Sequence, residues 1–546
     1  MIKITLANLF IMFNVFYYSQ CDSNIISGDY NITTNTTLSG SYYVTGNFYL
    51  APNVTITVSP FSSNSCGELK IYADKITIEG TINADGAGQA GGSGGYAGSS
   101  IMSSTSDTLA LTNCSDEDNP GQVEVLSGYA GNDGYGIGGA DGGKDGLAGS
   151  GPKQECGSTV DDAGVIGGSA GASSGGGGSY GGAGETGGFG GDGSDNYSVT
   201  NVPVSSAYAV NAGYGKTGGN AGVTYGTNTQ MEIAIGSGGA GAGGGGRSYS
   251  NGGIGSAGGT GGGLIMLFAY TDSLTIKGLL TANGTNGGIG GVGGSGGIGE
   301  DGNDGCCWDP CDDCGEKTYS CGAGGGGGAG GGSGGGILLK GYGINHIIGD
   351  IHTKGGNGGS GGSGGSGASC SYAGGWGCGS SQSISTSTGN AGDSGGGGGG
   401  GRIKIFASDC NGNIVLPNTD LFGGNGVNFG AAGYLHVDNN LPCNGVTPPP
   451  VGNNSLLTTN VNLDFNIFPN PTNNYINIKF NVSYINFENV ELFIYDIFGK
   501  QILTQKLSQN SWANLKLNVS DLSNGIYLIK ILSENYSGER RFTVTH

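Results

Sequence analysis

The sequence predicts an all-β protein in which a β-solenoid (β-helix-like) region with glycine-rich excursions precedes an antiparallel, immunoglobulin-like β-sandwich. Three observations lead to this fold class. Four segments repeat one alternation of apolar and polar residues, glycine recurs at every third position in several runs, and the composition changes abruptly after a proline-rich stretch at 443–454. Glycine supplies 125 of the 546 residues, several times its usual share of about 7%.

The first 20 residues have the pattern of a secretory signal peptide. Lys3 precedes a mostly apolar stretch that is short for a membrane span, and Ser19 supplies a small residue at the expected cleavage point. A lipoprotein processed at Cys21 fits less well, because Gln20 stands where a small residue is expected. No later segment is apolar enough to cross a bilayer. We therefore expect an exported protein without a transmembrane segment.

The solenoid is predicted from four segments that align with one another: 67–86, 263–284, 336–356 and 401–426. In the first segment Leu69, Ile71 and Ala73 alternate with polar residues, which is the period of a strand with one buried face. One such cluster cannot bury its apolar face alone, whereas stacked copies share a core. The N-terminal region therefore divides into a β region with the first coil, a glycine-rich insert, and further coils with glycine-rich excursions, at residues 21–85, 86–260 and 261–441.

The excursions contain a strict three-residue spacing. From Gly284 to Gly305 every third residue is glycine, and the same spacing recurs at 322–334 and 355–367. Collagen does not explain it, because the chain has only 13 prolines. A flexible linker is a second explanation, but a linker requires no such register.

A three-residue period is typical of an extended helix that rises about 3.1 Å per residue and places every third residue on one edge. With glycine on that edge, rods can approach closely and pair backbone N–H and C=O groups with one another. This arrangement resembles the polyglycine-II bundles of springtail antifreeze proteins and of some phage-tip adhesins. The resemblance rests on spacing and composition. It implies folded rods, with disordered loops as the alternative.

The cysteines fit an exported protein with disulfide bonds. Twelve cysteines follow Cys21, and an even number outside the cell favours disulfides. The dense patch at 306–321 includes a C-x2-C pair that could instead bind zinc, although oxidation competes with metal loading in this compartment. The disulfide candidates associated with the glycine runs are Cys306, Cys307, Cys311, Cys314, Cys321, Cys370 and Cys378.

After a linker at 442–462, residues 463–546 have the pattern of about seven short strands between turn signals, an antiparallel sandwich. Three motifs follow in order: Pro469-Asn470-Pro471, Asp496-x-x-Gly499 and Leu522-x-x-Gly525-x-Tyr527. This order resembles the C-terminal sorting domain of the Bacteroidetes type IX secretion system. The resemblance implies an address for the secretion machinery, with the preceding passenger (about residues 22–445) attached to the cell surface or released. An adhesive immunoglobulin-like module is the alternative.

The passenger is strongly acidic. The chain carries a formal charge of −21; acidic and basic residues balance from Leu463 onward, and Lys3 is the only charge ahead of Cys21, so the intervening region carries about −22. Such a surface repels nucleic acid and anionic lipid, and it attracts divalent cations. We therefore expect no nucleic-acid partner.

Few passenger residues suit catalysis, and we assign no catalytic or cofactor-binding residue. His352 lies two positions from Asp350 on one strand face, but a lone His–Asp pair is more often a surface contact than half of an active site. Residues 190–198 fit a calcium-binding nonapeptide with Asp195 as the ligand, and the acidic stretch 299–305 is a second, looser candidate. We therefore predict no cofactor, with calcium at these two sites as the alternative.

The sequence thus predicts a secreted adhesin or structural protein without enzymatic activity, which contacts an extracellular glycan or another extended surface through many weak contacts. Two alternatives stay open. A β-helix polysaccharide lyase or hydrolase would need clustered carboxylates with basic residues on adjacent coils, and basic residues are few. An ice-binding protein would show regular Thr and Ala ranks at the third position, where the residues here are mixed.

Overall fold

The computed structural model shows two compact units, Met1–Pro448 and Pro449–His546, and their boundary falls within the linker predicted at 442–462. No helix among the residues it describes is long and apolar enough to cross a membrane. The described residues are 23–98, 122–152, 163–204, 206, 209–299, 318–372, 380–408, 417–427, 429–441, 443, 461–462, 465–480, 490–496, 501–507, 515–520, 522–532 and 536–546.

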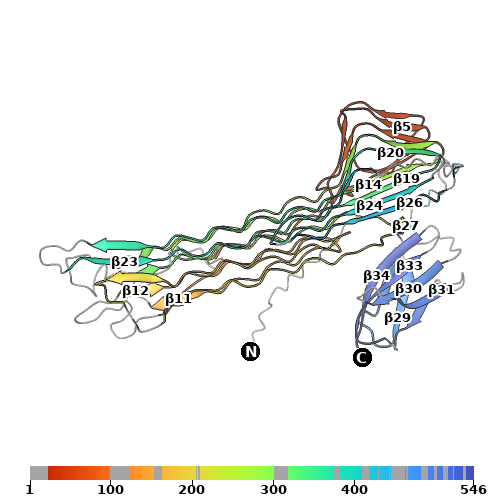
Figure 1. Ribbon diagram of the computed structural model, residues 1–546. Coiled ribbons are helices and arrows are strands. Elements are labelled where there is room, and N and C mark those ends of the chain that lie inside the picture. The colour runs from red at the N-terminus through yellow and green to blue at the C-terminus, as the bar shows by residue number, and fades with distance from the viewer. Residues whose placement is uncertain are drawn as a thin grey trace. The chain divides into compact units, whose positions relative to one another are not determined.

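In the first unit, successive coils each add strands to parallel sheets that stack into a β-solenoid (Figure 1). The first sheet contains, in order, β1 (Ser23–Ile26), β4 (Gly40–Val44), β7 (Glu68–Ala73), β14 (Leu264–Ala269), β19 (Gly336–Gly341), β24 (Arg402–Ala407) and β26 (Tyr434–Asp438). The second contains β2 (Tyr30–Ile32), β5 (Asn47–Leu50), β8 (Lys75–Ile78), β15 (Ser273–Ile276) and β20 (Ile344–Ile347). The third contains β3 (Thr36–Leu38), β6 (Thr55–Val58), β9 (Thr81–Asn83), β16 (Leu279–Thr281), β21 (Ile351–His352) and β25 (Thr419–Asp420).

The register of the first sheet matches the alignment of the four repeated segments. Ile265 pairs with Leu69 on one side and with Ile337 on the other, and Ile337 pairs with Ile403. Their side chains are fully buried in one core that the coils share. Stacked copies thus bury the apolar face that no single copy could bury. Two further coils, formed by β1 to β6, precede the first aligned segment.

Between coils the chain leaves the solenoid as glycine-rich rods. Outgoing rods follow strands of the third sheet, and returning rods lead into strands of the first sheet. The rods lie side by side and extend to the strands around β11, β12 and β23 (Figure 1). The outgoing rods are 86–98, 284–297 and 355–368, and the returning rods are 251–263, 321–335 and 386–401. The predicted insert adds rods at 126–135, 138–150, 167–180, 182–196, 211–225 and 236–248.

The rod 321–335 shows the hydrogen-bonding rule of the bundle. Its N–H groups at 322, 325, 328, 331 and 334 donate to carbonyls of the rod 386–401 at 2.9 Å, while those at 323, 326, 329 and 332 donate to the rod 284–297 at 2.7–3.0 Å. Successive residues therefore face different neighbours, with a period of three. The prediction of folded three-residue rods agrees with this geometry.

Glycine is required where two rods touch. A Cβ at Gly325 would lie 2.0 Å from the carbonyl oxygen of Gly362 in the neighbouring rod, well inside van der Waals contact. Because the extended rod makes no internal hydrogen bonds, this close approach is what lets its backbone groups find partners.

At the end of the rods away from the solenoid, short strands form small sheets around a satellite core that includes Val165, Tyr319 and Ile384. These strands are β10 (Gln122–Val125), β11 (Gly149–Pro152), β12 (Gly164–Ile166), β13 (Tyr197–Thr200), β17 (Ile298–Gly299), β18 (Thr318–Ser320), β22 (Ser369–Tyr372) and β23 (Gln382–Thr386).

The second unit is a β-sandwich, which together with the solenoid confirms the predicted all-β fold class. One sheet has the order β27-β34-β33-β30-β31 and the other the order β28-β29-β32, and Ile476, Ile529 and Phe542 are among the residues of their common core. The strands are β27 (Val461–Asn462), β28 (Phe465–Phe468), β29 (Tyr475–Phe480), β30 (Val490–Asp496), β31 (Gln501–Leu507), β32 (Leu515–Asn518), β33 (Gly525–Leu532) and β34 (Tyr536–Val544).

Candidate functional site

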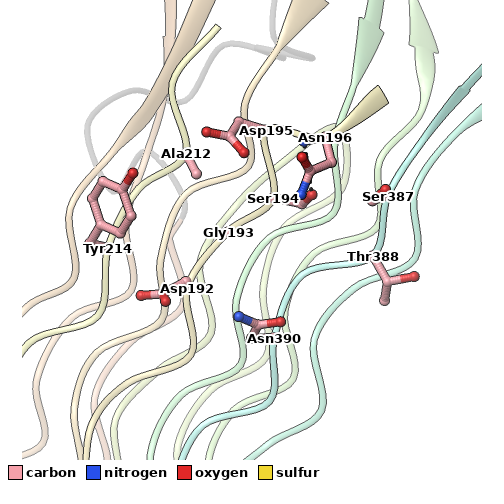
Figure 2. Close-up of a pocket in the computed structure, with 10 residues that line it drawn as sticks. All are labelled: Asp192, Gly193, Ser194, Asp195, Asn196, Ala212, Tyr214, Ser387, Thr388 and Asn390. Atoms are coloured by element: carbon pink, nitrogen blue, oxygen red, sulfur yellow. Dashed lines mark hydrogen bonds between the residues drawn. The ribbon is translucent and has the colours of Figure 1, made fainter. Parts of the chain in front are cut away.

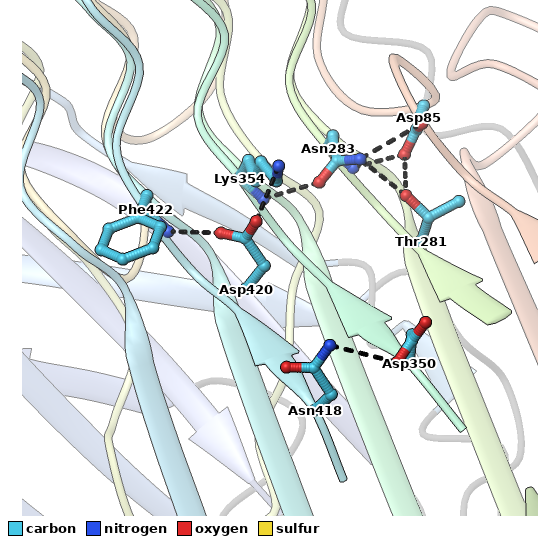
Figure 3. A network of polar contacts seen from close by, with 8 residues as sticks. All are labelled: Asp85, Thr281, Asn283, Asp350, Lys354, Asn418, Asp420 and Phe422. Atoms are coloured by element: carbon cyan, nitrogen blue, oxygen red, sulfur yellow. Dashed lines mark hydrogen bonds and ion pairs between the residues drawn. The ribbon is translucent and has the colours of Figure 1, made fainter. Parts of the chain in front are cut away.

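A ladder of polar side chains joins the third solenoid sheet to the rods (Figure 3). The carboxylate of Asp85 accepts hydrogen bonds from the Thr281 hydroxyl and from the backbone N–H of Asn283, both at 2.6 Å. The Asn283 side chain in turn accepts from the N–H of Lys354 at 2.7 Å, and the Lys354 ammonium lies 2.7 Å from the Asp420 carboxylate. The ladder fixes the register in which the rods leave successive coils.

Asp350, which the sequence pairs with His352, belongs to the same region (Figure 3). Its carboxylate accepts a hydrogen bond from the Asn418 side-chain amide of the next coil at 3.2 Å. Such a contact between coils is typical of a structural role. The absence of enzymatic activity stays a prediction.

Four of the rods form one continuous face without charged residues. The rods 86–98, 251–263, 284–297 and 355–368 contain no Asp, Glu, Lys or Arg. Hydrogen bonds place them side by side in that order: Gly255 N–H donates to Gly95 O, Ser256 N–H to Ile289 O, and Gly290 N–H to Ser360 O, at 2.9–3.0 Å. We call the outward-facing side of these four rods the uncharged face.

Exposure on the uncharged face follows the three-residue period. In the rod 355–368 the outward positions Asn357, Ser360, Ser363 and Ser366 are exposed. The residue immediately before each of them is buried. Apolar side chains occupy the same position on neighbouring rods, with exposed fractions of 63% for Tyr96, 67% for Ile254, 61% for Ile289 and 51% for Val292. This surface is repetitive, because each rod presents every third residue to solvent.

The acidic residues gather on other rods, where they border shallow grooves. One groove lies among the rods 182–196, 211–225 and 386–401 (Figure 2). The Asp192 carboxylate accepts from Gly215 N–H at 2.7 Å, and the Asp192 carbonyl accepts from Asn390 N–H at 2.8 Å. The groove is lined by Asp192, Gly193, Ser194, Asp195, Asn196, Ala212, Tyr214, Ser387, Thr388 and Asn390.

A second groove lies farther along the rods 182–196 and 211–225 and reaches the rod 138–150. In it the Asn220 side chain donates to the Asp141 carboxylate at 3.0 Å, and the Lys144 ammonium donates to the Thr217 hydroxyl at 3.1 Å. We call the side formed by these three rods the grooved side.

Asp195, the predicted calcium ligand, lines the first groove near Asp192 (Figure 2). The described residues contain no group of three or more His, Cys, Asp or Glu placed to hold a metal ion, whereas calcium takes six to eight oxygen ligands. The nonapeptide 190–198 ends a rod and enters β13, which pairs antiparallel with β23. Calcium binding at Asp195 stays a prediction, and the candidate stretch 299–305 lies almost entirely outside the described residues.

The cysteine predictions have mixed outcomes. Cys370 is disulfide-bonded, as are Cys66 and Cys443. The prediction for Cys321 is wrong, because its thiol is free and buried in the satellite core, where burial raises its pKa to about 12. The remaining candidates Cys306, Cys307, Cys311, Cys314 and Cys378 lie outside the described residues.

A buried lysine holds a loop of the insert against the solenoid. Lys404 points away from the core on β24 and is fully buried, and its ammonium donates to the carbonyl oxygens of Gln230 and Glu232. Burial lowers the pKa of Lys404 to about 8. The glycine-rich insert is thereby attached both to the rods and to a solenoid strand. Sequence periodicity gives no signal for this contact.

In the second unit, the sorting motifs surround the last strand. The Asn470 side chain accepts from Thr543 N–H at 2.9 Å and donates to the Arg541 carbonyl at 3.3 Å, so the Pro469-Asn470-Pro471 turn is held against β34. The Tyr527 hydroxyl donates to the Ser523 carbonyl at 2.9 Å.

The other motif residues surround the same strands. Gly525 begins β33, and Leu522 packs against the sandwich core. Asp496 ends β30, where its backbone pairs with Tyr527. Gly499 lies outside the described residues. The motifs therefore shape one end of the sandwich together.

Comparison with known proteins identifies the second unit and leaves the first without a relative. No curated protein and no solved structure matches the chain. Residues 466–545 match the family model described as a secretion system C-terminal sorting domain, in agreement with the motif order and the sandwich fold. The chain therefore carries a type IX secretion C-terminal sorting domain, and the protein is secreted by that system to the cell surface or the extracellular space.

Proposed function

We propose that the passenger is a non-enzymatic adhesin that contacts polysaccharide or another extended surface outside the cell. The observation that carries this proposal is the periodic exposure of one residue in three along rods tied together by backbone hydrogen bonds. Outward residues on one rod recur about every 9 Å, three times the rise of about 3.1 Å. Many weak, evenly spaced contacts suit a repeating ligand better than a single small molecule.

The shape and charge of the bundle support this reading. Its outward positions carry Ser, Asn and Tyr side chains, among them Ser93, Tyr96, Asn286 and Ser360, which offer hydrogen-bonding groups to sugar hydroxyls. The net charge of the passenger disfavours nucleic acid and anionic lipid as ligands. The sorting domain delivers the bundle to the compartment where polysaccharides occur.

The proposal is tested by incubating the purified mature protein with a panel of insoluble polysaccharides. Bound protein and newly released reducing or unsaturated ends are measured in the same tubes, with calcium and with chelator. We expect binding without product. Product formation would refute the non-enzymatic assignment, and absence of binding to every polysaccharide would refute the adhesin assignment. Loss of binding on chelation would support a metal at Asp195.

A further inference from the structure

The uncharged face carries an apolar patch formed by Tyr96, Ile254, Ile289 and Val292. Ile254 lies between the rods of Tyr96 and Ile289, since its neighbours Gly255 and Ser256 donate to Gly95 O and Ile289 O. Gly253 N–H also donates to Val292 O at 2.7 Å, which places Ile254 beside both Ile289 and Val292. All four apolar side chains are more than half exposed. Exposed apolar clusters on a folded surface mark interaction sites.

We infer that the uncharged face is the docking surface for a flat, uncharged polysaccharide, with the apolar patch contacting the C–H faces of the sugar rings. The inference rests on the proposed function and names the ligand class and the face. In a chain with a net charge of −21, a face without a single charged residue fits a neutral ligand, because neither attraction nor repulsion by fixed charges operates there.

The composition of the face favours a sugar polymer over a lipid or a purely apolar partner. Around the apolar patch stand hydroxyl and amide groups of Ser93, Asn286, Ser360 and Ser363, which are exposed. Sugar rings present both C–H faces and hydroxyls, and they need both kinds of contact.

The rigidity of the uncharged face also favours binding of an extended ligand. The rods of this face are tied to one another and to interior rods by backbone hydrogen bonds of 2.7–3.0 Å. A preformed surface loses little conformational entropy on binding.

The decisive experiment compares two substitutions of matched type on the two sides of the bundle. Ile289→Asp places a charge in the apolar patch, and Val223→Asp places one on the grooved side, where Val223 is 69% exposed. Both side chains point to solvent, so both variants should fold, which circular dichroism verifies. Binding of the mature proteins to microcrystalline cellulose and to chitin particles is measured at low and high salt.

We expect Ile289→Asp to weaken binding at least about tenfold, which corresponds to about 1.4 kcal/mol, and Val223→Asp to leave it unchanged. Wild-type binding should not depend on salt. Loss of binding in Val223→Asp alone would overturn the inference and leave the adhesin proposal standing, with the grooved side as the contact.

Three other results would also overturn the inference. Binding only to charged polysaccharides would overturn the inference while supporting the adhesin proposal, whereas binding to no polysaccharide would overturn both. A dimer in light scattering that Ile289→Asp dissociates would identify a second copy as the occupant and overturn the inference.

Discussion

Replacement of Gly359 by alanine tests whether the rod lattice depends on glycine at its contact positions. A Cβ at Gly359 would lie 1.9 Å from Gly288 O and 2.8 Å from Gly287 O, while real Cβ contacts stay above 3.0 Å. The rod would have to move by more than an ångström. Such a shift would break the hydrogen bonds from Gly359 to Ala329 and from Gly362 to Gly326, each 2.8 Å long.

The expected cost follows from those bonds. Losing two or three backbone hydrogen bonds at about 1 kcal/mol each outweighs the gain of about 0.4–1 kcal/mol from a stiffer unfolded chain, so Gly359→Ala should lower the free energy of unfolding by about 2 kcal/mol. The adjacent Ser360 points to solvent, and Ser360→Ala should change it by less than about 0.5 kcal/mol. Urea unfolding of the mature protein measures both. Equal stability of the two variants would refute the lattice as described.

Two further predictions concern charge and the sorting domain. Lys404 has a pKa of about 8 in the folded protein against 10.5 for the free side chain, so the unfolded chain binds more protons between these values. The stability of the wild type relative to Lys404→Met should therefore rise from pH 8 to 10.5 and stay level below pH 8; parallel pH profiles would contradict this. Asn470→Ala removes the hydrogen bonds to Thr543 and Arg541 and should destabilise the second unit by about 1–2 kcal/mol. Thermal unfolding of that unit measures the change. An unchanged midpoint would show that these two bonds make no net contribution to stability.

The solenoid and the sorting domain could be predicted from the sequence, because each is encoded by a pattern of residues that lie close together along the chain. Alternation of apolar residues on β7, β14, β19 and β24 fixed both the strand and its buried face, and the pairing of Leu69 with Ile265 follows from matching these patterns. The error at Cys321 has a different origin. Even cysteine counts argue for pairing in general, but the Cys321 thiol is free and lies in the satellite core, near the carbonyl oxygen of Asn196.

The sequence by itself predicted the three-residue period of the rods. Glycine or another small residue at two of every three positions, as in 355–368, leaves one position for side chains, and that position is the exposed one. Only the tertiary structure decided which rods are neighbours. The contacts between rods are mainly backbone hydrogen bonds. Backbone N–H and C=O groups are alike in every residue, so no local pattern labels one rod as the partner of another. The uncharged face and the grooved side therefore emerge only when the rods of distant excursions are assembled.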